Sequence, residues 1–152
     1  MNEQERRQSV IAEARSFVGT PFHFGASVKG VGVACGPFLI ACYAPFAREA
    51  GLTLPDPPPF AADWHFHTRD ERFCDVVASF CRRAIAPEPG DLALFRLGAK
   101  DRPWSHGAIV LNWPMVIHAQ FRSGVEYADA SRDVLLRTAS EVSFWSPWGF
   151  SK

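Results

Sequence analysis

Apolar residues follow a helical period through the first half of the chain and a strand-like period through the second half. The pattern predicts a first helix over residues 3–18, because apolar residues recur there on one face and Gly19 follows them. A second apolar face predicts a helix over residues 36–49, which contains Phe38, Leu39, Cys42, Tyr43 and Phe46. Pro45 removes one helix hydrogen bond, so we expect a kink or an early end near Ala44.

Residues 68–71 have the capping-box pattern Thr-Arg-Asp-Glu, which predicts the start of a third helix. Its apolar side would carry Phe73, Val76, Val77, Phe80, Cys81 and Ala84. The Pro-Glu-Pro-Gly-Asp run at residues 87–91 would end it.

After residue 90 the period changes to that of strands. Short strands are predicted over residues 91–97, 107–111, 115–120 and 125–127, followed by a strand or coil over residues 142–150. Helices first and strands later indicate an α+β fold, with N-terminal helices packed on a C-terminal antiparallel sheet. No repeat or linker divides the chain, so we expect a single domain over residues 1–152.

The charge balance limits the partners that the chain can attract. Sixteen basic residues balance sixteen acidic ones, so no overall field draws in nucleic acid or an anionic membrane. The five tryptophans and thirteen phenylalanines lack a basic cluster beside them, which favours core and groove walls over a surface that stacks bases. No apolar run is long enough to suggest a membrane span.

The first seven residues are charged and no apolar core follows them, so we expect no secretory signal and a cytoplasmic protein as synthesised. Without such a signal, the four cysteines are expected to remain thiols.

Cys35 stands between a small, flexible run and the apolar run of the second helix. Pro37 suits the first turn of a helix, which would place Cys35 at the helix N-terminus. Free N–H groups and the helix dipole favour a thiolate there, as a nucleophile requires. The alternative is a small buried cysteine beside a helix start.

His106 and His118 belong to neighbouring predicted strands. If the hairpin between them turns near Asn112, the two side chains lie across from each other on one face and can hydrogen-bond in series. Cys35 against this face would complete a nucleophile, a base and an orienting group. His106 would accept the thiol proton and later protonate the leaving amine, while His118 would fix its tautomer. Alternatively, each histidine is structural.

A metal site built from His65, His67 and a cysteine is a weaker alternative. The two rings point the same way only in a strand, and the cysteines lack the close spacing of a zinc site. We therefore expect no metal and no organic cofactor.

Five segments in order resemble the motifs of one family. GTPFHFG at residues 19–25 resembles the opening G-T-P-Y-x-Y-G, and GVACG at residues 32–36 falls where the family has G-x-D-C-S-G. PGDLALF at residues 89–95 resembles P-G-D-L-v-f-F, SHGAI at 105–109 resembles H-V-G-I, and VIHA at 116–119 resembles m-I-H-A. The chain is therefore similar to the NlpC family of bacterial cell-wall cysteine peptidases.

This resemblance implies a papain-like α+β fold, with Cys35 as nucleophile, His106 as base and His118 as third member. The family cuts amide bonds in peptidoglycan stem peptides without a cofactor. The candidate substrate-binding residues are Phe24, His23, Asp63 and Trp104.

Residues 26–32 resemble in particular the phage-tail and gene-transfer-agent branch of the family. The resemblance implies phage-tail proteins as partners and delivery to the cell wall by a tail-like particle.

Three positions depart from the family pattern. Ala34 replaces the acidic residue before the cysteine, Gly36 the serine after it, and Phe24 the second tyrosine of the opening. They favour the alternative function, a catalytically inactive NlpC-like module for binding or tail assembly.

Overall fold

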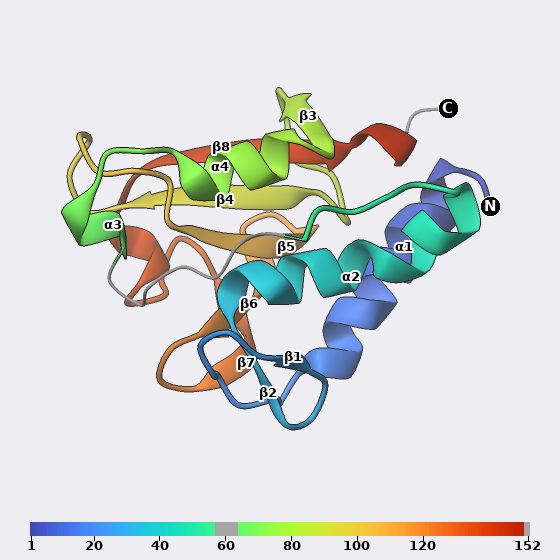
Figure 1. Cartoon of the computed structure of the whole chain (residues 1–152), viewed down its shortest axis with the longest axis horizontal. Coiled ribbons are helices and arrows are strands. Elements are labelled where there is room, and N and C mark those ends of the chain that lie inside the picture. The colour runs from blue at the N-terminus through green and yellow to red at the C-terminus, as the bar shows by residue number, and fades with distance from the viewer. Residues whose placement is uncertain (57–63, 151–152) are drawn as a thin grey trace.

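Six strands form one antiparallel sheet in the order β3-β8-β4-β5-β6-β7 (Figure 1). The strands are β3 (Cys81–Ala84), β4 (Leu92–Leu97), β5 (His106–Asn112), β6 (Met115–Gln120), β7 (Gly124–Asp129) and β8 (Ala139–Pro147). The structure, a computed structural model, describes residues 1–56 and 64–150. The sheet confirms the predicted α+β fold and the four middle strands within a few residues.

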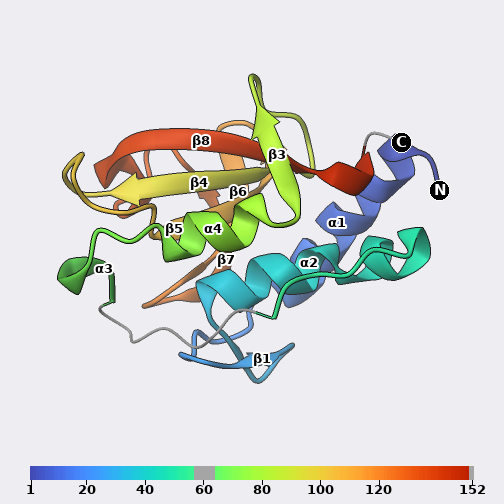
Figure 2. The same cartoon turned by 45° about the horizontal axis from the view of Figure 1, so that its top comes forward.

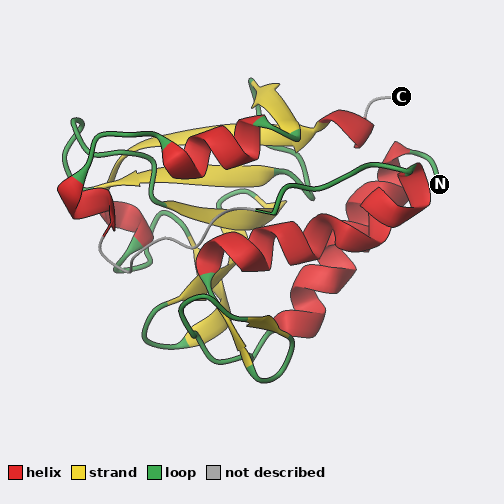
Figure 3. Cartoon of the chain, viewed as in Figure 1, coloured by secondary structure: helices red, strands yellow, loops and turns green. Residues whose placement is uncertain are grey.

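Helices cover one face of this sheet (Figures 2 and 3). They are α1 (Glu3–Phe17), α2 (Cys35–Ala50) and α4 (Arg72–Ala78), while the short α3 (Trp64–His67) lies at one end of the sheet, beside the loop between β4 and β5. A small hairpin of β1 (Ser27–Val28) and β2 (Gly32–Val33) precedes α2, and two 3-10 turns, η1 (Leu136–Thr138) and η2 (Trp148–Phe150), flank β8. The first two helices match the sequence prediction closely.

Side chains that alternate along the strands pack into two separate cores, one on each face of the sheet. In β5, Ile109 packs with the helices, whereas Ala108 and Val110 belong to a smaller cluster on the opposite face. Successive strand residues point to opposite faces, so the near-continuous apolar run of β5 indicates a strand covered on both sides. The larger core joins α1, α2 and α4 to the sheet.

Of the kink or early end expected near Ala44, the early end does not occur. Helix α2 continues through Pro45 to Ala50 and ends at Gly51, whose φ of 71° is the left-handed conformation that glycine adopts easily. Phe46 and Ala47, beyond the proline, are buried. Their packing therefore offsets the missing hydrogen bond.

The third predicted helix is wrong in both its start and its length. Thr68 does not cap α4, since its hydroxyl accepts from the N–H of Asp70 and the residue before the helix is Glu71. The chain leaves the helix after Ala78 and pairs as β3 with β8. Cys81 is thus on a strand rather than on the helix of Cys74, and all four cysteines are free thiols, as expected.

A buried ion pair fastens α1 to the start of β4. Asp91 is fully buried and accepts hydrogen bonds from the Arg7 guanidinium at 2.8 Å, from the N–H of Glu88 at 2.8 Å and from the Ser146 hydroxyl. A buried charge is tolerated only when its partners are in place, so these contacts hold the N-terminal helix against the sheet.

Asp91→Asn is expected to lower the free energy of unfolding by about 2–3 kcal/mol, because Arg7 then lacks its buried counter-charge. Urea denaturation measures the change. Glu3→Gln is the control, since it removes one of the two exposed partners of Arg7, Glu3 and Glu88, and should cost about 0.5 kcal/mol. Equal losses in the two variants would contradict this account.

Candidate functional site

Cys35 is the first residue of α2, and the small hairpin before it fixes its position. The N–H of Ala34 donates to the carbonyl of Ala26 across this hairpin, and Ala34 is extended at the helix N-cap. No side chain caps the helix, and the first N–H groups of a helix have no partner within it. Cys35 thus lies at the N-terminus of α2, as the sequence predicts.

Gly107 allows α2 to approach β5 closely. A Cβ on Gly107 would lie 2.5 Å from the Leu39 side chain, which no ordinary packing permits. Leu39 is one helical turn after Cys35 and on the same face, so this close contact brings Cys35 to the start of β5. His106 is the first residue of that strand.

His106 and His118 contact each other, as the sequence predicts. His106 Nε2 and His118 Nδ1 are 2.8 Å apart, and both rings are buried. Extending the register of Ile109 with Ile117 puts His118 beside Ala108, so the pair is diagonal on one face rather than directly opposite. The turn lies at Trp113 and Pro114 rather than near Asn112, which accounts for the difference, and diagonal neighbours remain within reach of each other.

Two carboxylates lie behind His118, and the sequence analysis missed both. His118 Nε2 is 3.7 Å from Glu126 Oε1 and 4.0 Å from Asp133 Oδ2, and it has no hydrogen-bond partner within residues 1–56 and 64–150. Glu126 is the register partner of His118 on β7. The N–H groups of Leu135 and Leu136 fix Asp133 through its other oxygen.

These carboxylates set the direction of the hydrogen bond between His106 and His118. They favour the His118 tautomer with its proton on Nε2, which leaves Nδ1 as an acceptor. His106 Nε2 then donates to His118, and the lone pair of His106 stays on Nδ1. A neutral His106 in this tautomer is ready to accept a proton at Nδ1.

Burial reverses the expected ionisation of Cys35. It raises the pKa of the thiol to about 11, although the N–H groups of Gly36 and Cys35 act in the opposite direction. Burial, followed by the neighbouring His118, holds the pKa of His106 well below its usual value. The resting pair is therefore a thiol and a neutral imidazole, not the thiolate that the helix N-terminus alone predicts.

Alkylation of Cys35 by iodoacetamide is expected to be slow at pH 7 and to rise steadily toward pH 11, because only the thiolate reacts. Peptide mapping at a series of pH values measures the rate at each cysteine. A rate that levels off near pH 7 would show a thiol with a lowered pKa and would contradict this assignment. Slow labelling at pH 7 is compatible with catalysis, since His106 can remove the proton during attack.

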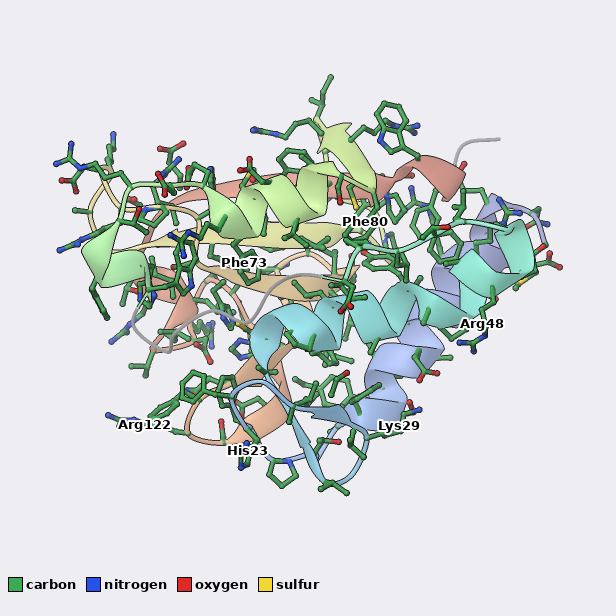
Figure 4. All side chains as sticks on the ribbon, in the orientation of Figure 1. His23, Lys29, Arg48, Phe73, Phe80 and Arg122 are labelled. Atoms are coloured by element: carbon green, nitrogen blue, oxygen red, sulfur yellow. The ribbon has the colours of Figure 1, made fainter. Side chains whose placement is uncertain are left out.

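A cavity of about 950 Å³ contains Cys35 and His106 in its wall. Its aromatic lining consists of Phe22, Phe24, Trp64, Phe73, Phe80 and Phe121. Figure 4 shows Phe73 and Phe80 between α4 and α2. Phe22, Phe24 and Phe121 contact one another at one end, with ring centroids 4.9–5.8 Å apart. The cavity therefore offers an apolar surface beside the thiol.

The four candidate substrate-binding residues have different places. Phe24 lines the cavity, whereas His23 is exposed at the loop beside β1 and is not among the lining residues (Figure 4). Trp104 is buried under the Arg96 guanidinium, 4.5 Å from its ring centroid, and does not line the cavity either. Asp63 lies outside the described residues.

The metal alternative from the sequence does not match the local structure. Residues 64–67 form the helix α3 rather than the strand that this alternative requires. Among the described residues, the single group with suitable donors and spacing is His118, Glu126 and Asp133. No helix in the described part of the chain has the length and apolar character needed to cross a membrane.

No model of a protein family matches the sequence, and no curated protein matches it. Solved structures do match. NlpC1 from Trichomonas vaginalis has a TM-score of 0.61 at 14% identity over 95% of this chain and 44% of that one. An NlpC/p60 family protein from Bacillus cereus has a TM-score of 0.59 at 18% identity, covering 91% of this chain and 39% of that one.

The NlpC/p60 domain of the peptidoglycan hydrolase SagA has a TM-score of 0.56 at 21% identity, over 90% of this chain and 96% of the domain. The chain thus spans less than half of the first and second of these neighbours and nearly all of the third. The identities are low, so the likeness concerns the arrangement of helices and strands. The chain has the papain-like α+β fold of NlpC/p60 domains.

Proposed function

We propose that the protein is a cysteine peptidase that hydrolyses amide bonds in peptidoglycan stem peptides. The observation that carries the proposal is the contact between His106 and His118 beside a cavity whose wall also contains Cys35. The fold is shared with a domain described as part of a peptidoglycan hydrolase, which supports the same substrate class. Cys35 is the nucleophile, His106 the base and His118 the orienting residue.

The reaction begins when the Cys35 sulfur attacks the substrate carbonyl carbon while His106 Nδ1 takes the thiol proton. Attack and proton transfer occur together, because a thiol with its pKa raised to about 11 does not ionise beforehand at neutral pH. The imidazolium on His106 is stabilised through His118 by the carboxylates of Glu126 and Asp133. His106 then gives the proton to the leaving amine. Water attacks the carbonyl carbon of the resulting thioester while His106 takes a proton from it, and that proton returns to the Cys35 sulfur as the carboxyl product leaves.

Backbone donors at the start of α2 stabilise the developing oxyanion. The N–H of Cys35 is among the first of the helix, and the helix dipole points its positive end toward the same place. Ala34 and Gly36 add no polar side chain here, so recognition relies on the apolar cavity and backbone groups.

Digestion of purified peptidoglycan and of synthetic stem peptides, followed by mass spectrometry, tests this function. Each cleavage should yield one new amine and one new carboxyl terminus, and the products together should exceed the parent by one water. Absence of products from every substrate with folded protein would favour the inactive binding or tail-assembly module instead.

The likeness of residues 26–32 to the phage-tail branch supports a further part of this proposal, namely transport to the cell wall on a tail-like particle. Tail proteins would then be its partners. Mass spectrometry of particles purified from cells that express the protein tests the association. Its absence from such particles would remove the delivery route but leave the proposed chemistry intact.

A further inference from the structure

We infer that His118, Glu126 and Asp133 form a zinc-binding site, and that zinc bound there switches off the base at His106. The binding itself is independent of the proposed peptidase function, whereas the inhibition depends on it. Zinc is the ion chosen because one imidazole nitrogen and two carboxylate oxygens are a donor set that it accepts.

The three donor atoms already lie together. His118 Nε2, Glu126 Oε1 and Asp133 Oδ2 are all within 4.8 Å of one another. Two ligands that share a zinc ion at bond lengths of about 2 Å are about 3.3 Å apart, so contraction by roughly 1 Å completes the site. Glu126 is partly exposed and its side chain can rotate inward.

Burial singles out His118 as the anchor of this site. Its side chain is fully buried, and its Nε2 is aimed at the two carboxylates without a hydrogen bond in the described part of the chain. Neither carboxylate forms an ion pair with a lysine or arginine of residues 1–56 and 64–150. A divalent cation would therefore neutralise two acidic groups without displacing a lysine or arginine of the described part of the chain.

Further contacts hold two of the ligands in place. His118 uses its other ring nitrogen for His106, and Asp133 uses its other oxygen for the N–H groups of Leu135 and Leu136. Hydrogen bonds of this kind orient ligands in metal sites and raise their affinity. Glu126 lies at the partly exposed edge, where an ion and its remaining water can enter.

Zinc would reverse the direction of the hydrogen bond between His106 and His118. The metal takes the lone pair on His118 Nε2 and displaces its proton, so the remaining ring proton must sit on Nδ1. That proton comes from His106 Nε2, across the 2.8 Å contact. His106 then takes up a proton at Nδ1, the atom that must accept the proton of Cys35. The two rings hold two protons before and after, so binding releases no net proton.

Calorimetric titration of Cys35→Ala protein with zinc chloride tests the site without the competing thiol. We expect one zinc per chain and the same heat in buffers of low and high ionisation enthalpy, since no net proton is released. In this background, Asp133→Asn and Glu126→Gln should each weaken binding by about tenfold or more. Asp101→Asn, an exposed acidic residue elsewhere, is the charge-matched control and should bind as before.

Several results would overturn the site. Zinc binding that is absent in Cys35→Ala protein, or that is unchanged in both folded acidic-residue variants, would place the metal elsewhere or exclude it. Release of one proton per zinc would contradict the reversal of the hydrogen bond between His106 and His118. Glu126→Gln remains informative if Asp133→Asn does not fold, since Glu126 makes no backbone contact of the kind that holds Asp133.

Activity provides the second measurement. Wild-type hydrolysis should fall at least tenfold at saturating zinc and return with a chelator, while magnesium should have no effect. Zinc bound at the site without loss of hydrolysis would overturn the switch. Should the wild type hydrolyse nothing even without zinc, the proposed function fails, but calorimetry still decides whether the site exists.

Discussion

Cys35→Ala is expected to lower the rate of stem-peptide hydrolysis by roughly 10⁴-fold or more, while the melting temperature stays within a few degrees of the wild type. The variant removes the atom that, in the proposed mechanism, forms the covalent bond to the substrate, and water in its place lacks both the position and the reactivity. The side chain shrinks by one sulfur atom at the edge of a cavity, so packing is barely changed. Product formation by mass spectrometry and thermal unfolding measure the two effects.

Cys74→Ala is the matched control, because Cys74 is also half-buried and free but does not line the cavity. It should keep wild-type turnover. Full hydrolysis by the Cys35 variant would exclude the thiol mechanism, and equal losses in both variants would point to a general effect on folding.

Periodicity in the sequence identifies the elements that carry the site. The apolar faces of α1 and α2 and the alternation in β4–β7 follow from local spacing, and the contact of His106 with His118 follows from a short hairpin. Where one local pattern is compatible with both a helix and a strand, pairing with distant segments decides which of the two forms. Residues 81–84 continue an apolar helical face, yet pairing with β8 makes them a strand.

The rest of the site depends on contacts between distant segments. Asp133 reaches His118 from the loop before η1, and no local spacing relates the two. Glu126 could have been found, because a hairpin between residues 115–120 and 125–127 sets it opposite His118. Phe121 joins Phe22 and Phe24 only in the folded cavity.

The ionisation of Cys35 shows a second limit of sequence reasoning. The helix N-terminus correctly predicts donors near the sulfur, but burial has the larger effect on the pKa and acts in the opposite direction. Burial is a property of the whole fold. A helix start by itself therefore does not determine whether its cysteine is a thiolate.

His106→Ala is expected to reduce kcat/KM by roughly 10³-fold, because general-base catalysis contributes about 10²–10⁴-fold and this thiol depends fully on a proton acceptor. His118→Ala should reduce it by about ten- to a hundredfold, since water can partly replace an orienting residue. Initial rates on one stem peptide measure both. The His118 variant also leaves a hole in a fully buried position, so its rate is taken at a temperature where thermal unfolding shows it folded.

Which of the two variants, His106→Ala or His118→Ala, loses more of its kcat/KM distinguishes the roles of the two histidines. His106 lines the cavity with Cys35, whereas His118 reaches the cavity only through its contact with His106. We therefore expect His106 to be the base that acts on the thiol, and loss of His118 should leave a slower but working base. A larger loss on removing His118 than on removing His106, with both proteins folded, would mean that the two roles are exchanged. His118 would then be the base and His106 the orienting residue.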